Sequence, residues 1–129
     1  ANHQAMVTAR AAKVDAAARL YGPLEVVQRC PEADTLVLAW GSTYGAVRSD
    51  VERRAAAGQN VDYIHLRHMH PLHPDLKATA DRYRRVVVVE MNEGQLAHHL
   101  QGLWARRVES VCKTTGQPFT TEELAELWN

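Results

Sequence analysis

Three segments of the chain carry side chains that could take part in chemistry. The first is rich in glycine and hydroxyl groups, the second is rich in histidine, and the third runs from four valines into a cluster of polar residues. In chain order they are WGSTYGAVR (40–48), HLRHMHPLH (65–73) and VVVVEMNEGQLAHHL (86–100). Such side chains suit anion binding, metal binding and acid–base chemistry, respectively.

The first segment supplies Gly41, Ser42, Thr43, Tyr44 and Gly45 between an apolar run and a predicted helix. Backbone N–H groups at a helix start favour an anion, and ligands of open α/β sheets lie beside the carboxyl ends of the strands. The spacing matches neither G-x-G-x-x-G nor G-x-x-x-x-G-K-[ST], so neither nucleotide-binding fingerprint is present. Two hypotheses stay open: a contact with a ligand or partner, or a tight turn in which Ser42 or Thr43 caps the helix.

The second segment contains His65, His68, His70 and His73. Imidazole is the commonest metal ligand in proteins, so zinc or nickel binding is one hypothesis. The spacing does not put the rings on one helix face, and the segment leaves a predicted strand for a loop broken by prolines. We therefore predict polar loop and strand-end histidines and no metal site.

The third segment places Glu90 directly after a predicted buried strand, followed by Asn92, Gly94 and Gln95. Loss of solvent raises the pKa of a buried acid, so a general acid or base is one hypothesis. No serine, cysteine or lysine nucleophile stands beside Glu90 in the sequence. We favour the other hypothesis, in which Asn92 caps the next helix and Glu90 accepts neighbouring backbone N–H groups, or the turn forms an interface. No catalytic residue is assigned.

The elements that must position these residues follow from the spacing of apolar side chains. Continuous apolar runs predict strands covered on both faces, and i, i+4 spacing predicts helices between them. The predicted strands are 24–28, 34–40, 60–66, 86–90 and 107–112, and the predicted helices are 3–20, 44–57, one that starts after Asp75, one that carries Leu96 to Trp104, and one opened by a Thr120–Glu123 capping box. This alternation predicts an α/β fold with a mostly parallel sheet and helices on both faces.

The overall composition narrows the class of protein. The 129 residues suffice for about one domain, and 15 basic residues balance 15 acidic ones, which gives no electrostatic case for nucleic acid or an anionic membrane surface. No apolar stretch approaches the ~20 residues that span a bilayer. Cys30 and Cys112 are far apart and too few for an all-cysteine iron–sulfur cluster, so we expect a reduced, cytoplasmic pair.

Four motifs in order carry a resemblance to a known family: WGSTYGAVRSDVE, HLRHMHPLHPDL, VVVVEMNEGQLAHHL and GQPFTTEEL. Together they resemble the C-terminal domain of the alpha subunit of 2-oxoacid:ferredoxin oxidoreductases, most closely the 2-oxoglutarate type. The resemblance covers about residues 34–127, and the segment HQAMVTARAAKVD resembles the helical lead-in of that domain. The chain departs from the family pattern at residues 70–73 and at Glu93, a charge where the family often has leucine.

The resemblance implies a fold like the transketolase C-terminal domain, a three-layer α/β/α arrangement around a five-stranded mixed sheet. Its first strand, here 24–28, would run antiparallel to the others. The chain would divide into a helical lead-in (1–23) and the domain itself (24–129).

The resemblance also implies a reaction. The family oxidatively decarboxylates a 2-oxoacid with coenzyme A to an acyl-CoA, or runs the reverse reaction, and passes electrons to ferredoxin. It uses thiamine diphosphate, magnesium and iron–sulfur clusters, none of which is expected within this domain. The expected partners are other domains of the alpha subunit and the thiamine-binding beta subunit.

The leading hypothesis is therefore a structural and interface domain of such an enzyme, inactive as an isolated fragment. Its candidate contact surface is formed by two turns, the first with Gly41, Ser42, Thr43, Tyr44 and Gly45, and the second with Glu90, Asn92, Gly94 and Gln95. The alternative is a free-standing α/β module that binds an anion or small ligand at Gly41–Gly45.

Overall fold

A computed structural model describes residues 13 and 16–129 of the chain. The predicted helix over 3–20 lies mostly outside the described residues. Of its described positions, residues 13 and 16–18 are helical and residues 19–20 form a turn. The division of the chain at residue 23 stays a prediction. Within the described part, no helix is both long and apolar enough to cross a membrane.

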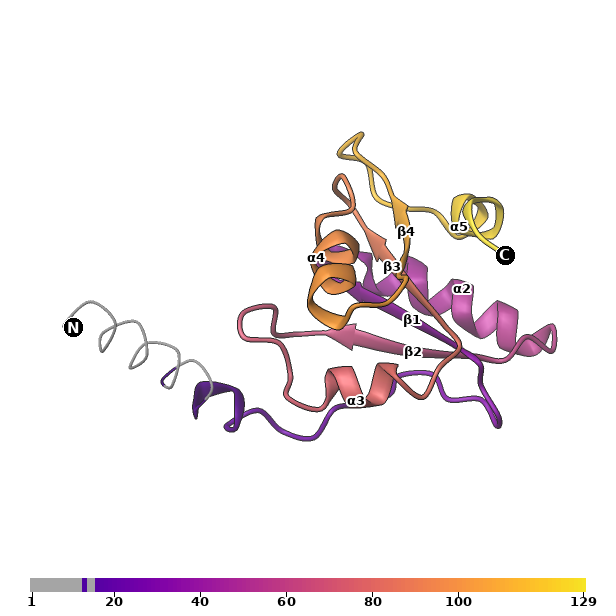
Figure 1. The fold of residues 1–129 in the computed structure, drawn as a ribbon. Coiled ribbons are helices and arrows are strands. Elements are labelled where there is room, and N and C mark those ends of the chain that lie inside the picture. The colour runs from indigo at the N-terminus through magenta and orange to yellow at the C-terminus, as the bar shows by residue number, and fades with distance from the viewer. Residues whose placement is uncertain (1–12, 14–15) are drawn as a thin grey trace.

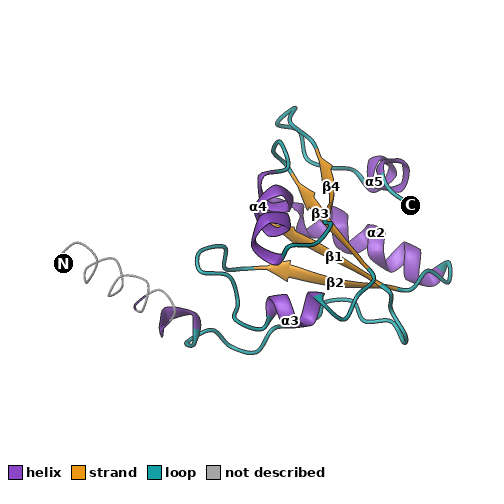
Figure 2. Ribbon diagram, viewed as in Figure 1, coloured by secondary structure: helices purple, strands orange, loops and turns teal. Residues whose placement is uncertain are grey.

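The centre of the fold is a sheet of parallel strands (Figures 1 and 2). In the described residues it contains four strands in the order β2-β1-β3-β4, with all three pairings parallel. The strands are β1 (Thr35–Trp40), β2 (Val61–Leu66), β3 (Arg85–Glu90) and β4 (Glu109–Cys112). The two central strands, β1 and β3, are the runs TLVLAW and RVVVVE, whose apolar side chains suit burial on both faces.

Helices cover both faces of this sheet (Figure 1). The 3-10 turn η1 (Gly41–Thr43) leads into α2 (Tyr44–Ala56), which is followed along the chain by α3 (Leu76–Ala80), α4 (Gln95–Trp104) and α5 (Thr121–Leu127). Leu36 and Val88 face a core shared with α3 and α4, while Val37 and Val87 face the core shared with α2 and α5. This alternation along each strand confirms the predicted α/β fold with helices on both faces.

The predicted first strand, 24–28, does not join the sheet as a regular strand. It lies antiparallel to β2, as the resemblance implied, but only one bridge forms, between Gln28 and Tyr63. The Tyr63 N–H donates to the Gln28 carbonyl at 2.9 Å. Just beyond the bridge, the Cys30 N–H donates to Oδ1 of Asp62 at 2.6 Å, which diverts the chain from the ladder. The regular sheet therefore has four strands where five were expected.

The predicted helix caps differ in their outcome. The capping box is confirmed, because Oγ1 of Thr120 accepts the Glu123 N–H at 3.1 Å. Thr43 and Asp75 occupy N-cap positions, but neither side chain makes a capping hydrogen bond. Both have helical backbone angles, whereas Thr120 is extended, the conformation from which a side chain reaches the first-turn N–H groups. The prediction that Ser42 or Thr43 caps α2 is therefore wrong.

A buried arginine joins α5 to α2. Arg54 and Asp50 are both 1% exposed, and Nε of Arg54 donates to Oδ2 of Asp50 at 2.9 Å. Nη2 of Arg54 donates to the carbonyls of Leu124 and Trp128 at 2.9 and 2.6 Å. The guanidinium also lies over the Trp128 ring, 3.6 Å from its centroid. One side chain of α2 thus holds the C-terminal helix in place.

Candidate functional site

The two predicted turns meet at the carboxyl ends of the strands. Strands β1 and β3 are parallel neighbours, so their carboxyl ends lie side by side. Nε1 of Trp40, the last residue of β1, donates to Oε1 of Glu90, the last residue of β3, at 3.2 Å. Further along the two turns, Oγ of Ser42 lies 3.7 Å from Sδ of Met91. The turns 41–45 and 90–95 therefore form one continuous surface.

Glu90 is the anchor of this surface. Its side chain is fully buried, and its two oxygens accept the backbone N–H groups of Leu96 and Ala97 at 2.9 and 3.1 Å. These are first-turn N–H groups of α4, where the positive end of the helix dipole favours an anion. Together with the Trp40 indole, three protein donors hold the carboxylate. The prediction that Glu90 accepts neighbouring backbone N–H groups is confirmed.

Asn92 and Gly94 shape the turn that leads into α4. Oδ1 of Asn92 accepts the N–H groups of Gly94 and Gln95 at 2.8 and 3.3 Å. The N-cap position itself belongs to Gly94, which has a φ of 84°. A Cβ atom at this position would lie 2.7 Å from Oγ of Ser110 on β4. Asn92 therefore orders the turn from two residues before the cap, and the prediction that it caps the helix is wrong because Gly94 occupies that position.

Burial divides the nine predicted residues into two groups. Thr43, Glu90 and Gly94 are buried and position the turns. The hydroxyl of Thr43 donates to the Trp40 carbonyl at 2.9 Å, inside the first turn. Exposed or half-buried residues form the outer surface, and these are Gly41, Ser42, Tyr44, Gly45, Asn92 and Gln95.

An aromatic group borders the first turn. The Tyr44 and His65 rings make an edge-on contact with centroids 5.0 Å apart, and Nδ1 of His65 lies 2.7 Å from the Tyr63 hydroxyl. Burial holds the pKa of His65 below its usual value, and the positive charge of Arg67 adds to this effect, while a backbone hydrogen bond with Gly41 opposes it. Sequence reasoning grouped His65 with the other histidines and missed this contact with Tyr44, because it depends on the pairing of β1 with β2.

Two of the remaining histidines, His68 and His73, lie beside the Tyr21 ring. His68 stacks on the Tyr21 ring, with centroids 3.8 Å apart. Nε2 of His73 lies 2.7 Å from the Gly22 carbonyl oxygen, and its Nδ1 accepts the Asp75 N–H at 3.0 Å. These residues border a cavity of about 290 Å³ between the chain at residues 21–25 and the end of β2.

The described residues offer no metal-binding geometry. Across positions 13 and 16–129, no group of three or more His, Cys, Asp or Glu side chains is placed to hold a metal ion. Cys30 and Cys112 are free thiols, and an all-cysteine iron–sulfur cluster needs four. The residues present therefore do not fit such a cluster, and no chemical step is derived through one.

Sequence reasoning missed two residues of the turn surface, Trp40 and Met91. Both stand inside the motifs that drew attention, but their apolar character indicated core packing rather than a contact between turns. A tryptophan at a strand end is a usable signal, since its indole N–H requires a partner when buried.

Comparison with known proteins gives consistent results. Residues 33–124 match the family described as pyruvate:ferredoxin oxidoreductase core domain II. The chain is 37% identical over 124 residues to 2-oxoglutarate oxidoreductase subunit KorA of Mycobacterium tuberculosis, covering 95% of this chain and 18% of that protein.

A solved structure agrees with this sequence similarity. It is the 2-oxoglutarate:ferredoxin oxidoreductase of Magnetococcus marinus, with 2-oxoglutarate, coenzyme A and succinyl-CoA bound. The TM-score is 0.83 at 31% identity, covering 95% of this chain and 22% of that one. The present chain thus spans about a fifth of each of these relatives. On the family match and the shared fold, the chain belongs to the pyruvate:ferredoxin oxidoreductase core domain II family.

Proposed function

We propose that this chain is the core domain II portion of an alpha subunit in a 2-oxoglutarate-type 2-oxoacid oxidoreductase. The whole enzyme would convert 2-oxoglutarate and coenzyme A to succinyl-CoA and carbon dioxide, with ferredoxin as electron acceptor. The support is the 37% identity to the M. tuberculosis subunit and the likeness to the M. marinus enzyme, whose structure holds these substrates and the product.

In this proposal the domain docks and supports rather than reacts. The observation that carries it is the state of Glu90, the one carboxylate of the surface that sequence analysis considered as an acid or base. Three protein donors occupy its oxygens within the buried turn, so it acts as a structural anchor. The exposed residues of the two turns, chiefly Ser42, Asn92 and Gln95, would contact a neighbouring domain or subunit. Thiamine diphosphate, magnesium and iron–sulfur clusters would be held elsewhere in the assembly.

A hybrid enzyme tests this proposal. Residues 33–124 of this chain would replace the matching segment of the M. tuberculosis subunit, and the assembled enzyme would be assayed for coenzyme A-dependent reduction of a viologen dye by 2-oxoglutarate. We expect the hybrid to retain activity, and we expect the isolated 129-residue chain to have none. A second hybrid with Ser42→Ala and Gln95→Ala, two exposed positions of the turns, should assemble less completely in size-exclusion chromatography.

Two results would contradict the proposal. One is a correctly assembled hybrid without 2-oxoglutarate-dependent activity, and the other is turnover by the isolated chain. The control hybrid carries His98→Ala and His99→Ala, two exposed positions further along α4, and should assemble like the unmodified hybrid.

The alternative of a free-standing anion-binding module is not favoured. Its hydroxyl groups would come from Ser42 and Thr43, but the Thr43 hydroxyl donates to the Trp40 carbonyl and Ser42 Oγ contacts Met91. The first turn is organised by contacts within the domain.

A further inference from the structure

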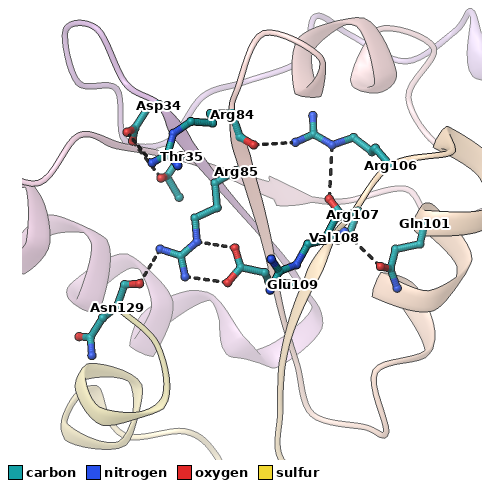
Figure 3. Close-up of polar contacts among 10 residues, drawn as sticks. All are labelled: Asp34, Thr35, Arg84, Arg85, Gln101, Arg106, Arg107, Val108, Glu109 and Asn129. Carbon is teal, nitrogen blue, oxygen red and sulfur yellow. Dashed lines mark hydrogen bonds and ion pairs between the residues drawn. The ribbon is translucent and has the colours of Figure 1, made fainter.

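An arginine-rich groove lies at the amino ends of β3 and β4. The two turns lie at the opposite, carboxyl ends of the strands. The groove is open to solvent and has a volume of about 780 Å³. Its polar lining comes from two segments that are distant in sequence, and it includes Tyr83, Arg84, Arg85, Arg106, Arg107 and Glu109. Figure 3 shows how these arginines gather around the start of the two strands. We call this surface the arginine groove.

One arginine of the groove is neutralised within the domain. Nη2 of Arg85 donates to Oε1 of Glu109 at 2.7 Å, and Nε of Arg85 donates to the other carboxylate oxygen (Figure 3). This hydrogen-bonded guanidinium holds the pKa of Glu109 below its usual value, which keeps the carboxylate charged. Arg85 and Glu109 therefore neutralise each other within the domain.

Two further arginines keep their charge. Arg106 donates to the carbonyls of Ala80, Arg84 and Arg107 at 2.9, 3.2 and 3.4 Å, so its guanidinium is held in place without a carboxylate partner. Arg107 is exposed. Within the described part of the chain, none of the ion pairs involves Arg106 or Arg107.

A third arginine adds to this charge. Arg84 is 75% exposed, and its pairing with Asp34 at 3.1 Å lies at the solvent boundary, where such a pair is weak. The chain as a whole has a net charge of zero, so the positive field of the groove is local.

The chemistry of the lining selects the kind of partner. A phosphate site commonly uses backbone N–H groups of a glycine-rich loop, and the groove has no glycine among its lining residues. Arginine together with tyrosine is typical of protein interfaces, and the half-buried Tyr83 lies beside the arginines.

We propose that the arginine groove docks a carboxylate-rich surface of a protein partner. Arg84, Arg106 and Arg107 would pair with Asp or Glu side chains, and the immobilised Arg106 would lose little conformational freedom on binding. Because the groove and the two turns lie at opposite ends of the strands, this contact would be separate from the interface proposed above. The domain would then contact neighbouring domains or subunits at both ends of its strands.

A titration of the isolated chain with a blocked hexaglutamate peptide tests the proposal. ¹⁵N-labelled protein would be followed by NMR, and we expect saturable shifts that cluster at residues 83–85 and 104–109. Arg107→Gln should weaken binding roughly two- to fivefold, the range of one exposed ion pair. Salt at about 1 M, which shortens the Debye length to about 3 Å, should weaken it further. The matched control is Arg67→Gln, which changes an exposed arginine just after the carboxyl end of β2 and should leave the affinity unchanged.

The same titration can overturn the proposal. Absence of saturable shifts would do so, as would shifts centred outside the groove or an equal loss of affinity from Arg67→Gln. Inorganic pyrophosphate and a single-stranded DNA oligonucleotide are run in parallel, and tighter binding of either one in the groove would assign a different class of ligand. The Arg107 side chain is exposed, so this variant should fold normally, and its circular dichroism spectrum would be compared with that of the unmodified chain.

Discussion

At the residue scale, Glu90 shows how a buried charge becomes a structural part. A carboxylate removed from water is tolerated only when its oxygens find donors, and Glu90 finds two backbone N–H groups and an indole. The donors come from α4 and from the end of β1, so one side chain links three elements. The position that looked most like a catalytic acid therefore holds the turn surface together.

This role predicts the effect of Glu90→Gln. Glutamine keeps the shape but turns one acceptor oxygen into an NH₂ donor, which must then face another donor in a buried place. We expect the free energy of unfolding to fall by about 1–3 kcal/mol, measured by urea denaturation. The control is Glu93→Gln in the same turn, an exposed position where little change is expected. Equal losses for the two variants would show that Glu90 is not the anchor.

At the element scale, two glycines of the same helix have opposite requirements. Gly94, at the start of α4, has a positive φ and lies against Ser110. Gly102 lies within α4, is exposed, and has no atom within 4 Å of an added Cβ. The start of α4 thus requires a glycine because its backbone is left-handed there. The interior of α4 has room for a side chain at Gly102 and does not require a glycine.

Alanine substitutions should separate the two positions. Gly94→Ala should destabilise the chain by about 1–2 kcal/mol, because an L-residue is strained in the left-handed region. Gly102→Ala should stabilise it by up to about 1 kcal/mol, the difference in helix propensity. Both changes are read from thermal or urea unfolding. The same sign for both variants would contradict this account of α4.

At the scale of the whole molecule, Arg54 joins the last helix, α5, to α2 on the same face of the sheet. Its guanidinium contacts Asp50, two carbonyls near the chain's end and the Trp128 ring. Such a residue stabilises the docking of α5 rather than α2 alone, because most of its partners come from the C-terminal segment.

Arg54→Ala should therefore be severe. It removes the buried partner of the Asp50 carboxylate, which keeps only its pairing with the exposed Arg53, and breaking a buried ion pair costs up to about 3–5 kcal/mol. Arg48→Ala, on the exposed side of the same helix, is the control and should have little effect. Urea unfolding gives both values, and limited proteolysis should reveal earlier cleavage near α5 in the Arg54 variant. A mild effect at Arg54 would mean that α5 is held mainly by Leu124 and Phe119.

Much of this fold was predictable because its signals are local. The strands at 35–40, 61–66 and 85–90 lie within one residue of the predicted ranges, since a parallel sheet covered on both faces requires continuous apolar runs. The Thr120–Glu123 capping box was also predictable, because all of its partners lie within one turn. The segment 24–28 was harder, since its β-type residues could not reveal that Asp62 takes the Cys30 N–H group.

By itself, the sequence determined the class of fold, the position of most elements and the family, because apolar periodicity and motif order are properties of the linear chain. Only the tertiary structure decided which polar residues are anchors and which face outward. Thr43 and Ser42 are neighbours in the chain, yet one is buried and the other exposed. Glu90 meets Trp40 because β1 and β3 are adjacent in the sheet although β2 separates them in the chain. The arginines at 84–85 and 106–107 share a groove for the same reason: pairing between strands joins residues that no local pattern connects.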